Sequence, residues 1–368
     1  GYTVSAMRAK GTEKQGLFGT LGDNAAIKKT GISNSWVEVT ARNSGYAGGI
    51  AGYVNGTGIE ITECGNKGNL SVTSSDNGEC FYIGGCVGTI GASSADLVLD
   101  GCYNTGTISV QNGLCVGGII GVVEGAANPA EIRNCMNRGK VEGDGVIAIA
   151  GIIGSAASGE AAITGCYNAG AVSTTLAGGY VGSIIISETG MTSSDVTDCL
   201  IDEKYNYGSS WNNPVVKSTA FGTWGAAFAL NGKKLGQAAG SISWTYQSGN
   251  AYPTYGMLDG AESWERVAEG VEYGLIGEKP ANGGSTDPYQ ITTAEQLAWF
   301  AYQVNHVEGM SGTQAVLTAD IDMKEAESKY KSAERLEWEP IGKRGTAGYT
   351  GSFESSNPAD AADIHKIY

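Results

Sequence analysis

The stretch Cys102-Tyr-Asn-Thr-Gly106 is one copy of a Cys-x-Asn-x-Gly turn that recurs along the chain and decides its fold. The other copies, the last of them degraded, begin at Cys64, Cys135, Cys166 and Cys199. Successive copies lie 38, 33, 31 and 33 residues apart. A second phrase of the form Gly-Gly-Ile-x-Gly keeps the same period, as in Gly117-Gly-Ile-Ile-Gly121. A period of about 20–50 residues is typical of stacked repeat architectures.

Each repeat carries three apolar segments, and each segment reads as a short strand bounded by turns. In one repeat they are residues 96–102, residues 107–110 and the Gly-Gly-Ile-x-Gly phrase. A single coil cannot bury its apolar side, whereas stacked coils bury a continuous core. We therefore expect an all-β chain that folds as a parallel β-helix, or β-solenoid, with coils of about 33 residues.

Equivalent positions of stacked coils form columns, so the repeated turn predicts a structural ladder. Its members are Cys64, Cys102, Cys135, Cys166, Cys199, Asn66, Asn104, Asn137 and Asn168. A buried cysteine behaves as a small hydrophobe, and stacked asparagine amides can hydrogen-bond one another. The glycine two places after each asparagine is expected to supply a positive φ. We favour free thiols over disulfides, and a zinc site is disfavoured because the sequence has no CxxC pair.

Composition narrows the classes of partner. The chain has 368 residues with 58 glycines, and its formal net charge is −15. An acidic chain lacks the basic face that nucleic acids and anionic membranes require, so we expect neither as a partner. No apolar run is long enough to cross a bilayer, and no signal peptide opens the sequence. Both ends read as strands, which predicts an internal piece of a longer polypeptide.

The rhythm of the repeats divides the chain into four parts. Residues 1–200 carry the β-solenoid repeats, residues 201–257 are expected to cap the solenoid, and residues 258–286 read as a linker. Residues 287–368 are expected to begin a second β-helix module. This last part contains an amphipathic helix over residues 294–304, with a capping box formed by Thr292 and Glu295 that starts it.

A search for chemistry finds no catalytic motif, metal site or cofactor site. The acidic residues of the repeats fall at scattered coil positions, and Asp320 and Asp322 lack the loop that a calcium site requires. A binding surface is the better candidate, because aromatic and aliphatic residues recur beside the asparagine turn. The candidate stripe consists of Tyr103, Met136, Tyr167, Tyr205, Tyr207 and Trp211. Inward packing of the first three, and a simple cap-filling role for the others, remain open at this point.

The run Gly16-Leu-Phe-Gly19, the Gly-Gly-Ile-x-Gly phrases and the Cys-x-Asn-x-Gly turns resemble the GLUG-type repeats of large bacterial surface proteins. Residues 289–297, 317–322 and 338–342 resemble the start of the same module in anaerobic gut Firmicutes. The resemblance implies a non-catalytic, extracellular region of a cell-wall-associated protein, with a structural or adhesive role. It is also compatible with an accessory region of a secreted peptidase or glycan-degrading enzyme, and with a surface protein that binds immunoglobulin or host glycan.

The same resemblance suggests how copies of the module relate to one another. In such proteins a segment like residues 349–353 leads into a strand like residues 1–4. The chain is therefore expected to be one period of a tandem array, or a subunit that docks head to tail, and head-to-tail contacts that do not close generate filaments. A fragment cut from inside a longer protein is the alternative. The expected partners are other copies of the module and a host glycan or protein.

Overall fold

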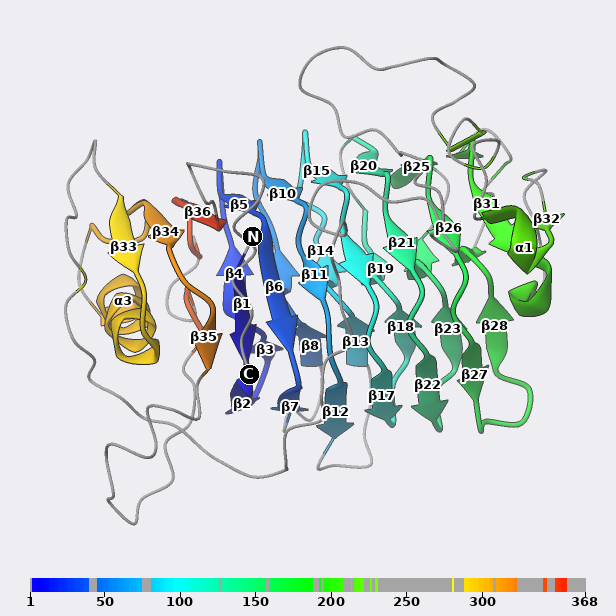
Figure 1. Ribbon diagram of the computed structural model, residues 1–368, viewed down its shortest axis with the longest axis horizontal. Helices are drawn as coiled ribbons and strands as arrows, with labels where there is room; N and C mark the ends of the chain where they lie inside the picture. The colour runs from blue at the N-terminus through cyan, green and yellow to red at the C-terminus, as the bar shows by residue number, and fades with distance from the viewer. Residues whose placement is uncertain are drawn as a thin grey trace.

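The computed structural model describes most of the repeat region and parts of the C-terminal region (Figure 1). The residues described are 2–39, 45–74, 81–125, 128–156, 159–187, 192, 195–207, 213, 215–221, 226, 229–230, 280, 288–306, 309–322, 340–342 and 348–355.

Each repeat folds into one coil, and each coil contains five short strands rather than the three that the sequence predicts. One coil consists of β16 (Tyr103–Asn104), β17 (Ile108–Gln111), β18 (Cys115–Gly117), β19 (Ile120–Val123) and β20 (Ala130–Arg133). The two residues after Cys102 form a strand of their own, and the Gly-Gly-Ile-Ile-Gly phrase bends at a corner that separates β18 from β19. Among the described residues, β1 to β30 make six such coils.

Equivalent strands of successive coils pair in parallel and form five sheets, which confirms the predicted all-β parallel β-helix. Sheet I has the order β32 (Val215–Val216), β31 (Leu200–Asp202), β26 (Tyr167–Asn168), β21 (Met136–Asn137), β16, β11 (Gly65–Asn66), β6 (Thr30–Ser33), β1 (Tyr2–Ser5) and β35 (Ile321–Asp322). Sheet II has the order β2 (Arg8–Gly11), β7 (Ser35–Val39), β12 (Leu70–Ser74), β17, β22 (Val141–Asp144) and β27 (Val172–Thr174).

The other three sheets follow in chain order around the coil. Sheet III has the order β28 (Tyr180–Gly182), β23 (Ala148–Ala150), β18, β13 (Phe81–Gly84), β8 (Gly45–Gly48) and β3 (Lys14–Gln15). Sheet IV has the order β29 (Ile185–Ser187), β24 (Ile153–Ala156), β19, β14 (Val87–Ile90), β9 (Ala51–Val54) and β4 (Phe18–Leu21). Sheet V has the order β30 (Val196–Thr197), β25 (Ala161–Thr164), β20, β15 (Val98–Asp100), β10 (Glu60–Thr62), β5 (Ala26–Lys28), β36 (Ser352–Ser355), β34 (Ala315–Leu317) and β33 (Tyr289–Ile291).

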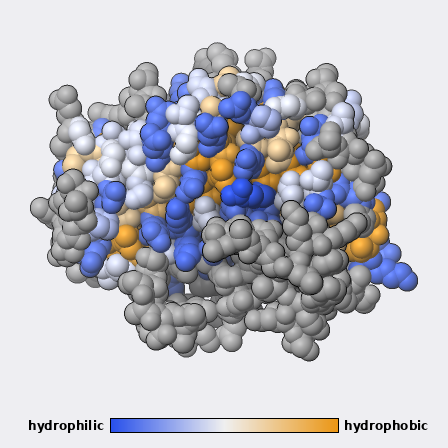
Figure 2. Space-filling model, turned by 90° about the horizontal axis from the view of Figure 1, so that it is seen from above, coloured by the Kyte–Doolittle hydropathy of each residue, from blue (hydrophilic) through white to orange (hydrophobic). Residues whose placement is uncertain are grey.

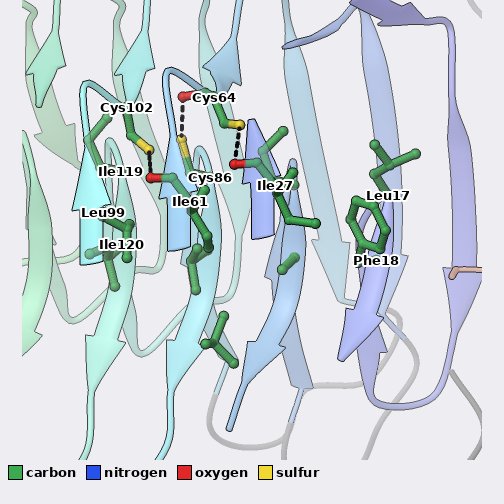
Figure 3. Close-up of a cluster of buried hydrophobic side chains, with 14 of the residues drawn as sticks. Leu17, Phe18, Ile27, Ile61, Cys64, Cys86, Leu99, Cys102, Ile119 and Ile120 are labelled. Atoms are coloured by element: carbon green, nitrogen blue, oxygen red, sulfur yellow. Dashed lines mark hydrogen bonds between the residues drawn. The ribbon is translucent and has the colours of Figure 1, made fainter. Parts of the chain in front are cut away.

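The core consists of columns of like side chains, because the parallel register places each residue on its counterpart in the next coil. In sheet V, Ile61 pairs with Ile27 on one side and with Leu99 on the other (Figure 3). The cysteines that follow the strands of Ile61 and Leu99 are buried, and each bonds to the previous coil. The Sγ atom of Cys64 donates to the Ile27 carbonyl at 3.5 Å, and that of Cys102 donates to the Ile61 carbonyl at 3.4 Å.

The ladder cysteines are therefore packing residues. All five are buried and present as free thiols, as are Cys86 and Cys115, whereas Cys80 lies outside the described residues. Burial raises the pKa of the Cys64 thiol, and the neighbouring Cys102 raises it further. At Cys102 burial acts in the same direction, but hydrogen bonds with the Cys135 and Cys86 thiols outweigh it and lower the pKa to about 5. All five sulfur atoms of the column are buried in the core, so they serve packing.

The four ladder asparagines form one chain of buried amides. The Nδ2 atom of Asn66 donates to Oδ1 of Asn104 at 2.8 Å, and Asn104 donates to Asn137 at 2.7 Å. Asn137 in turn donates to Asn168 at 2.8 Å, and Asn168 ends the chain on the Gly170 carbonyl at 3.2 Å. Each buried amide thus finds its partner in the adjacent coil, as buried polar groups must.

The left-handed residue of each turn differs from the one that the sequence predicts. It is the residue before the cysteine, with φ between 52° and 65°: Glu63, Gly101, Asn134, Gly165 and Asp198. The glycine after the asparagine serves close packing instead. A Cβ on Gly106 would lie 1.7 Å from the Gly68 carbonyl oxygen, so no larger residue fits between these coils.

The C-terminal region differs from the predicted second β-helix module. Its strands β33 to β36 join sheets I and V at the N-terminal end of the same solenoid, next to β1 and β5 (Figure 1). The helix α3 (Ala294–His306) covers this end and buries Leu297 and Phe300. The reason is physical: the first coil would otherwise expose an open strand edge and one face of the core.

Both ends of the solenoid carry a helix. Helix α3 begins at Ala294 as predicted, but its capping residues differ from the predicted Thr292 and Glu295: Gln296 N donates to the Thr293 hydroxyl, and Thr292 N donates to Gln296 Oε1. At the other end, β32 extends sheet I and is followed by the short helix α1 (Ser218–Phe221). The described part of the predicted linker is Pro280 alone. No helix in the described part of the chain is long and apolar enough to span a membrane.

Candidate functional site

The predicted stripe of Tyr103, Met136 and Tyr167 is fully buried, which excludes it as an exposed binding surface in this structure. The three residues occupy one row of sheet I, on the side opposite the asparagine amides. The segment after the last coil folds back over them, and Phe221 lies against Tyr167 with ring centroids 5.4 Å apart. The row thus points out of the solenoid core, but the returning chain covers it.

The other members of the predicted stripe lie at the C-terminal end. Tyr205 closes the 3-10 turn η1 (Glu203–Tyr205), where the Lys204 ammonium lies 5.1 Å from its ring centroid. Tyr207 is partly buried and packs against the main core. Trp211 lies outside the described residues. The structure therefore does not join these residues into one continuous surface.

A different set of aromatic side chains lines the outer side of sheets III and IV, and we call it the tyrosine face. Its members are Lys14, Tyr46, Tyr53 and Tyr82. Lys14, Tyr46 and Tyr82 occupy successive rungs of sheet III, and Tyr53 follows Tyr46 in the same coil on β9. The three tyrosines are half-buried, so part of each side chain remains accessible.

Ring contacts hold the tyrosine face in a fixed arrangement. The rings of Tyr46 and Tyr82 stack with centroids 5.9 Å apart and an interplanar angle of 23°. Tyr46 and Tyr53 meet with centroids 5.1 Å apart, and the Lys14 ammonium lies 4.6 Å from the Tyr53 ring centroid. Aromatic and cation–π contacts of this geometry each favour one orientation of the ring. The face is therefore ordered before any partner arrives.

The position of the tyrosine face follows from the glycine that ends each Gly-Gly-Ile-x-Gly phrase. A Cβ on Gly121 would lie 2.5 Å from Ile83 N, and one on Gly88 would lie 2.7 Å from Ala47 N. Only glycine lets strands of sheet IV approach strands of sheet III this closely. The outer sides of the two sheets consequently meet at an angle, which we call the crease. A small cluster of Cys115, Val122 and Ala148, separate from the main core, packs in the crease.

Charge near the tyrosine face is mixed. The Lys14 ammonium stands over Tyr53, and burial, Tyr46 and the Glu124 carboxylate together raise the pKa of the Tyr53 phenol. A raised pKa keeps this phenol protonated across the physiological range, so it can both donate and accept a hydrogen bond. The face thus combines ring surfaces, hydroxyl groups, a cation and a carboxylate.

The outer surface beyond the crease is partly apolar towards the C-terminal coils. Tyr180 has the same register position as Tyr82 and Tyr46 and is 64% exposed. Leu176, four residues before Tyr180, and Ile147, whose carbonyl accepts from Tyr180 N in the adjacent coil, are also exposed. Seen from above, the molecule shows hydrophobic areas that lie among hydrophilic residues (Figure 2).

The sequence does contain the signal for the tyrosine face, although the predicted stripe lies elsewhere. The residue two places before the first glycine of the phrase is tyrosine in three repeats, at Tyr46, Tyr82 and Tyr180. The period places these residues in one row, but the sequence does not reveal that this row stays open while the row at Tyr103 is covered by the returning chain.

The placement of the acidic, histidine and cysteine side chains bears on metal binding. Among the residues that the structure describes, no group of three or more His, Cys, Asp and Glu side chains is arranged to hold a metal ion. Asp320 accepts a hydrogen bond from the backbone N of Thr3 at 2.7 Å, so this carboxylate ties the C-terminal region to the first coil.

No protein-family model, curated protein or solved structure compared with the chain matches it. The resemblance to GLUG-type repeats therefore depends on the motifs of this chain alone.

Proposed function

We propose that this chain is a non-catalytic scaffold segment of a large, extracellular bacterial surface protein, and that it binds a host glycan through the tyrosine face. The scaffold part is supported by the stacked coils, whose cysteine and asparagine columns connect every coil to the next. The cell-surface location is supported by the resemblance to GLUG-type repeats. A solenoid of this kind presents a long lateral surface at a fixed spacing of about 4.8 Å per coil.

The single observation that carries the binding proposal is the pre-ordered row of Tyr46 and Tyr82 beside Tyr53 and Lys14. Tyrosine offers an apolar ring and a polar hydroxyl at a low cost in side-chain entropy, which suits a partner that is itself amphipathic. A glycan has this character, because its C–H groups pack on rings while its hydroxyls bond to phenols and charged groups. Fixed rings also lower the ordering cost of binding.

A glycan-binding measurement with matched variants tests this proposal. The purified chain is applied to immobilised mucin glycans and, in parallel, to serum proteins. The double variant Tyr46→Ala/Tyr82→Ala is expected to lose at least about tenfold in glycan affinity, equivalent to about 1.4 kcal/mol. Tyr205→Ala, which alters a tyrosine at the far end of the solenoid, is expected to bind as the unaltered chain does. Circular dichroism establishes that each variant is folded.

Two outcomes would contradict the binding proposal. Equal glycan binding by the double variant and the unaltered chain would exclude the tyrosine face, and selective capture of a serum protein would replace the glycan with a protein partner. The double variant Tyr46→Phe/Tyr82→Phe then separates ring packing from hydroxyl bonding, because it retains the rings and removes two hydroxyls. Antibody labelling of intact cells of the producing bacterium tests the surface location separately.

A further inference from the structure

The N-terminal end of the solenoid is completed by residues from the opposite end of the sequence. We call this unit, described over residues 288–306, 309–322, 340–342 and 348–355, the C-terminal cap. Its strand β36 pairs with β5, which places Phe353 opposite Ile27, and its strand β35 pairs with β1, which places Ile321 opposite Val4. The first coil thus receives its outer neighbour from a segment about 320 residues away, as the Thr3–Asp320 hydrogen bond also shows.

An aromatic cluster seals the C-terminal cap on the first coil. Phe18 stacks on Tyr349 with ring centroids 5.2 Å apart and meets Phe353 edge-on at 5.4 Å. Phe300 of helix α3 completes the cluster from behind, 6.1 Å from Tyr349 and 6.0 Å from Phe353. All four rings are fully buried, so Phe18 depends on the cap for its burial.

Within the described part of the chain, the C-terminal cap contacts the solenoid through its first coil. These strand pairings and ring contacts involve residues between Val4 and Lys28. A second copy of the chain presents the same first coil with the same residues. The surface to which the cap binds is therefore available on any copy whose own cap is displaced.

The connection between solenoid and cap does not dictate which copy is capped. The Leu230 carbonyl lies beside Gly165, next to β25, whereas the cap begins near β33, seven strand positions away in sheet V. That separation is about 34 Å at about 4.8 Å per strand. The 57 residues between Leu230 and Pro288 could extend to about 190 Å, several times the distance required.

We propose that the C-terminal cap is exchangeable: it closes the first coil of its own chain, or it closes the first coil of a second copy and so joins copies head to tail. A unit that makes the same contacts within and between chains is a low-cost route to association, and a head-to-tail contact that does not close produces filaments. The inference rests on the scaffold part of the proposed function for its biological role. Its readout is association, so it stands or falls independently of glycan binding.

Shortening the connection in the full chain tests the exchange. Deleting residues 234–285 leaves five residues between Leu230 and Pro288, which reach about 21 Å and cannot span the about 34 Å that self-capping requires. This variant is expected to form dimers or longer head-to-tail species, measured by light scattering after size exclusion. Deleting only residues 255–274 leaves 37 residues, which reach about 125 Å, and is expected to remain a monomer.

The variant Phe353→Asp identifies the contact that joins the copies. It places a charge among Phe18, Phe300 and Tyr349. In the short-connection chain it should therefore lower the apparent affinity of one copy for another at least tenfold. Oligomers that persist with Phe353→Asp would show that another surface joins the copies and would overturn the proposal. A folded short-connection chain that stays monomeric at all concentrations would overturn it as well.

A second measurement uses the chain unaltered, in case the short-connection variant does not fold. Two differently tagged copies are mixed, partly unfolded and refolded together, and complexes that carry both tags are counted. Tethering of the cap to its own chain should give an effective concentration of the order of 1 mM, so mixed complexes should appear near that concentration and fall about tenfold after a tenfold dilution before refolding. Absence of mixed complexes near 1 mM would contradict exchange, as would their formation by Phe353→Asp chains.

Discussion

At the scale of the residue, this fold depends on positions whose neighbour is their own counterpart in the next coil. Asn104 bonds to Asn137, and Gly106 packs against Gly68 so closely that no Cβ fits between them. A repeated residue therefore stabilises its own repetition, because each copy satisfies or accommodates the next. This explains why the Cys-x-Asn-x-Gly turn persists while the surrounding sequence varies.

Asn137→Ala is the sharpest test of the amide column. Asn137 accepts from Asn104 at 2.7 Å and donates to Asn168 at 2.8 Å. Its removal leaves the buried Asn104 amide donor without that acceptor, and it leaves Asn168 Oδ1 with Gly170 N as its remaining donor in the described structure. We expect the free energy of unfolding in urea to fall by about 3 kcal/mol, because an unsatisfied buried donor costs about 1–3 kcal/mol and the second lost hydrogen bond adds about 1 kcal/mol. The exposed Asn128→Ala is the control. Equal stability of the two variants would show that the column does not stabilise the fold.

At the scale of the element, the angle between sheets III and IV creates the candidate site. The terminal glycine of the phrase brings each sheet IV strand against sheet III, and the tyrosines stand on the outer side of the crease. In the last coil the phrase has Ile186 where the glycine would be, and the pairing of β24 with β29 shifts its register there. A larger residue at that position thus coincides with a loss of the regular register.

Gly121→Ala should reproduce this effect inside the solenoid. A Cβ at this position would lie 2.5 Å from both the Gly88 carbonyl oxygen and Ile83 N, and neither backbone group can move without separating two strands. We expect a loss of about 2 kcal/mol or more in unfolding free energy, in the range of an overpacked core. Gly312→Ala is the matched control, since its Cβ would meet only the Thr350 hydroxyl at an ordinary 3.5 Å. If both variants lost the same amount of unfolding free energy, the crease would not be a packing constraint.

The sequence predicts the fold class well and the candidate site poorly, for one physical reason. Periodicity reports local, coil-to-coil contacts, so it leads directly to a parallel β-helix and places Cys102 and Asn104 in a column. It does not report contacts between distant segments. The cover that Phe221 places over Tyr167, and the pairing of Phe353 with Ile27, both join segments that no repeat relates. The buried stripe and the misplaced second module are both errors of this kind.

At the scale of the whole molecule, the solenoid behaves as a one-dimensional stack closed at both ends. Each coil contacts its immediate neighbours, one end receives the C-terminal cap, and the row at Tyr103, Met136 and Tyr167 is covered by the chain that leaves the last coil. Stability in such a stack is approximately a sum over coils and the interfaces between them. The number of coils is therefore adjustable, provided that each boundary between coils keeps its register.

Removal of one whole coil tests this view of the molecule. Deleting residues 105–137 joins Asn104 to Arg138, which occupies the same coil position as Thr105, so Val141 replaces Ile108 in register against Leu70. We expect a folded, cooperatively unfolding monomer with a strand-rich circular dichroism spectrum and somewhat lower stability. Deleting residues 105–140 instead joins Asn104 directly to Val141 and removes the three-residue turn, so sheet II can no longer keep its register and the chain should fail to fold. Because Tyr46, Tyr53 and Tyr82 precede both cuts, the shorter solenoid should keep the ring contacts of the tyrosine face and lose only the contribution of the Glu124 carboxylate to glycan affinity. If the two deletions behaved alike, the coil would not be the unit from which this molecule is built.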